Sequence, residues 1–76
     1  MRVYGYDLTK KKKATIELSE ISLSLSPSEL RDLSRFFATT ADTMEKWGDK
    51  FGHEHFSDFL KSKLQPDIIV IGIAAD

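Results

Sequence analysis

The stretch that decides the fold is SPSELRDLSRFFATTADTMEKWG, which occupies residues 26–48. Ser26 precedes Pro27, and Glu29 stands three residues after Ser26, which is the pattern of an N-cap, a first-turn proline and a capping box. Gly48 is a typical signal for the end of a helix. Between these signals, apolar residues recur mainly at spacings of three and four, so the sequence predicts one long helix over residues 27–47. Its apolar stripe consists of Leu30, Leu33, Phe36, Phe37, Ala41, Met44 and Trp47.

Two strands are predicted before this helix. Residues 1–8 alternate in part and hold tyrosine and valine, which favour a pleated surface. Residues 14–25 alternate as well, with serines toward water and isoleucine and leucine toward the core. Their apolar side chains change parity at Ser19-Glu20, so we expect a β-bulge there or a strand that breaks in two. Four consecutive lysines at residues 10–13 are interpreted as the exposed tip of a hairpin; the alternative is a polybasic patch for a membrane or a phosphate.

The sequence after the helix predicts one further strand and a possible second one. Residues 51–59 are interpreted as a short, irregular strand, and residues 60–65 as a loop. Residues 68–73 are continuously apolar and mostly β-branched, which predicts a central strand covered on both faces, or covered by the helix and by loop side chains. The simplest arrangement is a two-layer α+β fold, in which an antiparallel sheet of three to four strands carries the long helix on one face. The expected order is β-β-α-(β)-β.

The length and composition of the chain limit its organisation and its partners. Its 76 residues allow one domain, over residues 1–76. The absence of cysteine leaves packing alone to hold the fold, which suits a reducing cytoplasm. The N-terminus lacks the apolar segment of a signal peptide, and the longest apolar run is far too short for a membrane span. With a net charge of -1, we expect a cytoplasmic protein that binds neither membranes nor nucleic acids.

Both histidines of the chain lie in the segment GDKFGHEHFSD, which occupies residues 48–58. Histidine is the side chain most often used for chemistry at neutral pH, so a functional site is first sought here. His53 and His55 are two positions apart. They would point to the same side of a strand but to nearly opposite sides of a helix. A shared role for the two histidines therefore requires an extended backbone.

The histidine segment has three interpretations. In the first, His53 and His55 bind a metal ion with Asp58, Glu54 or Asp49, although zinc would need at least three such ligands. In the second, one histidine is a general base that Asp58 or Glu54 orients, but neither a nucleophile motif nor a glycine-rich phosphate loop accompanies it. In the third, the histidines are structural and tie the segment to the sheet through hydrogen bonds. On balance we expect neither an enzyme nor a bound cofactor.

Five short segments, spread over most of the chain, carry a resemblance to a known family. They are VYGY (residues 3–6), SPSEL (26–30), ADTME (41–45), FGHEHFSD (51–58) and PDIIV (66–70). The most specific part is the His-x-His-x-x-Asp pattern of His53, His55 and Asp58, which precedes an Asp-Ile-Ile-Val strand. On these segments the chain resembles a small immunity-protein family of bacterial polymorphic toxin systems.

The resemblance implies an α+β fold and a cognate toxin protein, which the chain would neutralise by stoichiometric binding. It supplies no catalytic residues. We expect the contact on the face opposite the helix, or at the edge formed by residues 53–58, because the apolar stripe of the helix belongs to the core. The candidate partner-binding residues are His53, Glu54, His55, Asp58 and Trp47. The alternative is a small metal- or pH-responsive regulatory domain that uses His53 and His55, with Asp58 as a third metal ligand; a homodimer formed through a sheet edge or face also stays open.

Overall fold

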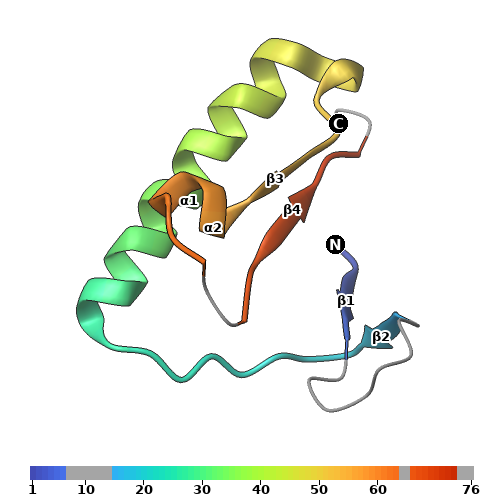
Figure 1. The fold of residues 1–76 in the computed structure, drawn as a ribbon. Coiled ribbons are helices and arrows are strands. Elements are labelled where there is room, and N and C mark those ends of the chain that lie inside the picture. Colours follow the sequence, from blue (N-terminus) through green and yellow to red (C-terminus); the bar gives the residue numbers. More distant parts are fainter. Residues whose placement is uncertain (7–14, 64–65, 74–76) are drawn as a thin grey trace.

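The computed structural model describes residues 1–6, 15–63 and 66–73 (Figure 1). The fold is α+β, as predicted, but the four described strands form two separate antiparallel pairs, β1 with β2 and β3 with β4. The expected single sheet of three to four strands is therefore not formed. In chain order the elements are β1 (Val3–Gly5), β2 (Ile16–Leu18), α1 (Pro27–Trp47), the 3-10 turn η1 (Gly48–Lys50), β3 (His53–His55), α2 (Phe56–Leu60) and β4 (Ile69–Ile71).

The long helix α1 begins and ends where the sequence predicts. The Ser26 hydroxyl accepts a hydrogen bond from the Glu29 amide at 3.2 Å, and the Glu29 carboxylate accepts one from the Ser26 amide at 2.9 Å. This is the predicted capping box, which satisfies amides that the first turn would otherwise leave without partners. At the other end, Gly48 has a φ of 57° and its amide donates to the Met44 carbonyl. A positive φ is far easier for glycine than for other residues, which explains the stop.

The face of α1 that is buried is narrower than the predicted apolar stripe. Leu33 and Phe36 are each 2% exposed and Thr40 is 4% exposed, whereas Leu30 and Phe37 are 55% and 46% exposed. The reason is the small size of what packs against α1. The helix α2 has five residues and β4 has three, so together they cover only the central turns of a 21-residue helix. The prediction that Leu30 and Phe37 belong to a buried stripe is therefore wrong.

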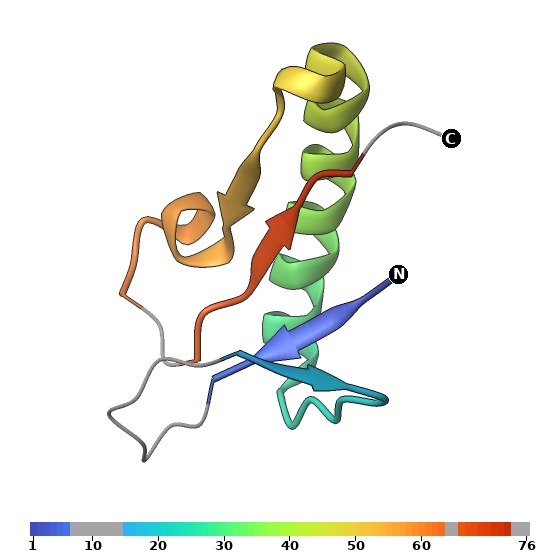
Figure 2. The same ribbon diagram turned by 90° about the vertical axis from the view of Figure 1, so that its right-hand side faces the viewer.

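The hydrophobic core is small and lies between α1 and the chain segment that follows it. Phe36 of α1 meets Phe56 of α2, with 5.2 Å between the two ring centroids. Partly buried side chains surround this contact: Leu25, Leu60, Ile68 and Val70. In Figures 1 and 2, β3 and β4 run alongside α1, while the hairpin of β1 and β2 lies apart from α1 near the base of the molecule. The core therefore belongs mainly to the C-terminal two thirds of the chain.

The second strand is much shorter than the predicted span of residues 14–25. Strand β2 ends at Leu18, which pairs with Val3. Beyond Leu18, none of the described strands pairs with residues 19–25. Neither the expected β-bulge at Ser19-Glu20 nor a second half-strand is formed. The predicted lysine hairpin tip lies outside the described residues.

The last part of the chain also departs from its predicted form. The expected strand over residues 51–59 covers only His53–His55, after which α2 begins. Strand β4 pairs with β3 alone among the described strands, so it is not a covered central strand. Its Ile69 and Ile71 are 46% and 63% exposed. Two three-residue strands are too few to cover both faces of a continuously apolar segment.

The total accessible surface is 6985 Å². Among the described residues, no helix has both the length and the apolar character that crossing a membrane requires.

Candidate functional site

The strand pair β3–β4 divides its side chains between two faces. Val70 packs against the core, and Glu54, which pairs with Val70 in register, lies beside α1. Side chains alternate along a strand, so the neighbours of Val70 and Glu54 lie on the opposite face. We call this the outer face; it consists of His53, His55, Ile69 and Ile71. It is the sheet face opposite the helix, which is one of the two contact surfaces expected from the sequence.

The two histidines share this face, as the strand interpretation requires. Their ring centroids are 5.2 Å apart and the rings meet edge to face. In the register of the two strands, His53 lies opposite Ile71 and His55 lies opposite Ile69. The outer face therefore places two imidazole rings next to two exposed isoleucine side chains. The outer face thus presents both polar and apolar groups to its surroundings.

His55 is held by a carboxylate that is not among the candidate residues predicted from the sequence. Its Nδ1 lies 2.7 Å from Oδ2 of Asp67, the residue that stands two positions before β4. The other oxygen of Asp67 accepts hydrogen bonds from the amides of Ser57 and Ile68, both at 2.9 Å. Because Ser57 lies in the first turn of α2, one carboxylate joins the end of β3, the start of α2 and the approach to β4.

This network shifts the pKa of both of its ionisable groups. The hydrogen bond to Asp67 raises the pKa of His55 above its ordinary value of 6.5; partial burial lowers it, and the charges of Asp67, Asp58 and Glu54 raise it further. Burial raises the pKa of Asp67, but the hydrogen bonds from His55, Ser57 and Ile68 outweigh this effect and leave the pKa below its ordinary value of 3.8. The pair is therefore stabilised in its charged form.

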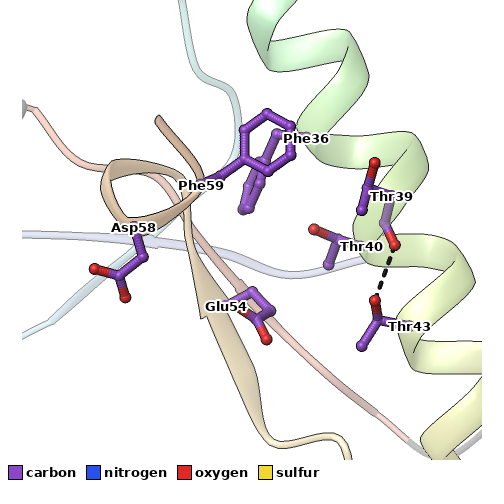
Figure 3. A pocket seen from close by; sticks show the side chains of 7 residues that line it. All are labelled: Phe36, Thr39, Thr40, Thr43, Glu54, Asp58 and Phe59. Carbon is purple, nitrogen blue, oxygen red and sulfur yellow. Dashed lines mark hydrogen bonds between the residues drawn. The ribbon is translucent and has the colours of Figure 1, made fainter. Parts of the chain in front are cut away.

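The two acidic candidates lie around a different feature, a shallow notch between α1 and the β3–α2 segment (Figure 3). The volume of the notch is about 210 Å³, which is smaller than the roughly 300–1,000 Å³ of most small-molecule sites. In Figure 3 the Thr40 hydroxyl points from α1 into it, while the Asp58 carboxylate is turned outward. The residues that line the notch are Phe36, Thr39, Thr40, Thr43, Glu54, Asp58 and Phe59.

The candidate residues are thus brought together only in part. His53 and His55 share the outer face, while Glu54 and Asp58 line the notch. Trp47 ends α1, where it is 54% exposed and has the Lys46 ammonium 5.8 Å from its ring centroid. Within residues 1–6, 15–63 and 66–73, no group of three or more potential ligands could hold a metal ion. The alternative set of His53, His55 and Asp58 therefore does not form a metal centre in this arrangement.

Sequence reasoning missed three residues of the site, namely Asp67, Ile69 and Ile71. The isoleucines were assigned to a covered strand because a continuous apolar run usually has both faces buried. Asp67 stands 12 positions from His55 in the sequence, and no spacing rule joins the two residues. The one available signal was the position of Asp67 between Pro66 and the predicted strand. An acidic side chain directly before an apolar strand is expected to point away from the core and toward polar groups. Comparison of the chain with family models, with curated proteins and with solved structures found no match.

Proposed function

We propose that this chain is an immunity protein, which neutralises a cognate bacterial toxin by stoichiometric binding through the outer face. The observation that carries the proposal is the exposure of Ile69 and Ile71, at 46% and 63%, beside His53 and His55 on the side of β3–β4 turned away from α1. Four ordered side chains of mixed polarity on one face offer a partner both apolar area and hydrogen-bonding groups. The resemblance of the sequence to toxin-neutralising proteins specifies the kind of partner.

The size of the chain is sufficient for this role. A standard protein interface takes about 800 Å² from each partner, which is a small part of the 6985 Å² that this chain exposes. Binding by a surface needs no enclosed pocket, so the shallowness of the notch is no obstacle. The network around Asp67 favours tight binding, because it fixes the backbone beneath the outer face before the partner arrives and so reduces the entropy lost on association.

Growth rescue tests the proposal. Where a toxin-like gene neighbours the gene of this chain, that gene is expressed in cells with and without the chain. We expect the chain to restore growth and to co-purify with the toxin in equimolar amounts. If growth is not restored although both proteins accumulate, the proposal is wrong.

A pair of variants tests the location of the contact. Ile71→Lys places a charge on the outer face, and Ile16→Lys is its matched control, because Ile16 is also a strand isoleucine and is 51% exposed. We expect Ile71→Lys to lose rescue and Ile16→Lys to keep it, with both variants folded by circular dichroism. Equal rescue by the two variants would exclude the outer face as the binding surface.

A second function, a pH-responsive regulatory domain, is favoured by one specific observation, the contact between His55 and Asp67. The groups near His55 are Asp67, Asp58 and Glu54, whose charges all raise its pKa, and His53, whose ring is 5.2 Å from that of His55. The metal-responsive form of this function needs a third ligand from outside the described residues. A zinc titration followed by NMR separates the metal-responsive form from the immunity protein: saturable shifts at both histidines would favour the metal-responsive form, and their absence would favour the immunity protein.

A further inference from the structure

The connection between β2 and α1 has the sequence of a strand but no partner strand among the described residues. Residues 19–25 have neither helical nor strand structure, and no backbone hydrogen bond joins them to another described residue. Figure 1 shows them as part of the open link that runs along the base of the molecule. Ile21 and Leu23 are 54% and 50% exposed, and only Leu25 packs against the core. An apolar strand-like segment with a free backbone readily pairs with another chain.

The sequence of this segment is complementary to itself. Residues 21–25 read Ile-Ser-Leu-Ser-Leu, so the order of apolar and polar side chains is the same in both directions. If two copies pair antiparallel about Leu23, Ile21 lies opposite Leu25, Ser22 lies opposite Ser24, and Leu23 lies opposite itself. Every apolar side chain of both copies then points to one face, and every serine to the other. A twofold axis through Leu23 produces this match, because symmetric dimers bring the same patch together twice.

We propose that residues 21–25 pair as an antiparallel strand with the same segment of a second copy of this chain. The apolar face of the new strand pair would continue the core, because Leu25 already contacts it. The pairing uses neither the outer face nor the notch, so it goes beyond the proposed function, and a dimer would present two outer faces.

The exposure of the segment supports a second copy as the occupant. Ile21 and Leu23 are 54% and 50% exposed in the single chain, and pairing about Leu23 places each of them against an apolar side chain of the other copy.

Symmetric disulfide formation tests the pairing, and the natural chain contains no cysteine to interfere. Residues directly opposite in an antiparallel pair have Cα atoms about 4.5–5.5 Å apart, within the range of about 4.4–6.8 Å that a disulfide spans. We expect Leu23→Cys to form a covalent dimer under mild oxidation. Ser22→Cys alone should not, because its copies lie diagonally at about 7–8 Å. A mixture of Ser22→Cys and Ser24→Cys should cross-link.

Sedimentation of the unmodified chain provides the second measurement. We expect twice the single-chain mass of 8.6 kDa, and a return to the single-chain mass in Leu23→Lys, where two like charges would face each other. Leu23 is half exposed, so the folded chain should tolerate either substitution. A single-chain mass at all concentrations would overturn the proposal. So would a dimer that Leu23→Lys leaves intact, or cross-linking of Ser22→Cys as fast as that of Leu23→Cys.

Discussion

At the scale of single residues, Asp67 has the most partners in the candidate site. Its two oxygens bind the His55 ring and the amides of Ser57 and Ile68. Hydrogen bonds to a charged group contribute more to stability than those between neutral groups, because the charge strengthens the attraction. The carboxylate therefore stabilises the geometry of the outer face, although it lies outside the set of side chains expected to contact a partner.

Replacing Asp67 by alanine should lower the free energy of unfolding by about 1–3 kcal/mol, because it leaves two amides and an imidazole without their acceptor. Urea unfolding followed by circular dichroism measures the change. Asp42→Ala is the control, because Asp42 is exposed on α1 and its loss should change stability by less than about 0.5 kcal/mol. Equal stability of the two variants would mean that the network contributes nothing.

The same network predicts how stability depends on pH. The folded pKa of His55 is raised above 6.5, so its contribution is fully present below pH 6.5 and is lost as the pH rises through the folded pKa. The folded pKa of Asp67 is below 3.8, so its contribution is present above pH 3.8 and is lost as the pH falls through the folded pKa. We expect the free energy of unfolding to decrease from pH 6 to pH 8. His55→Gln should weaken this decrease, and an unchanged slope in that variant would contradict the assignment.

At the scale of elements, the sequence predicted the helix α1 correctly, because interactions between residues close in the sequence determine where a helix begins and ends. The limits of α1 follow from Ser26, Glu29 and Gly48, each of which acts within one turn of the helix end. The length of β2 does not follow from its own sequence, because it depends on pairing with the distant residues Val3–Gly5. For a similar reason, only part of the outer face could be predicted. The alternation of side chains along β3 is visible in its sequence, whereas the exposure of β4 depends on the number of strands that pair with it.

The narrow buried face of α1 gives a testable contrast between two leucines of one helix. Leu33 is 2% exposed and Leu30 is 55% exposed. We expect Leu33→Ala to cost about 2–5 kcal/mol of stability, as for other buried leucines, and Leu30→Ala to cost well under half as much. Thermal unfolding of the two variants measures the difference. An equal loss of stability in the two variants would indicate that both leucines are buried, as the sequence predicts, and would contradict the packing described above.

At the scale of the whole molecule, the sequence predicted the α+β class but not the division into two strand pairs. The class follows from the number and type of elements, which periodicity reveals. The pairing of strands depends on contacts between distant residues, which a single sequence does not encode in any local pattern. Likewise, the histidine pair was found from spacing alone, whereas its partner Asp67 and the isoleucines opposite it became apparent only in three dimensions.

The central claim is that the outer face binds a toxin. Hydrogen–deuterium exchange of the chain, measured alone and in an equimolar mixture with the toxin from which it rescues cells, tests this claim most directly. We predict slower exchange on toxin addition in β3 and β4, and unchanged exchange in the exposed turns at the start of α1. Protection confined to α1 or to the hairpin of β1 and β2, or no protection at all, would contradict the account.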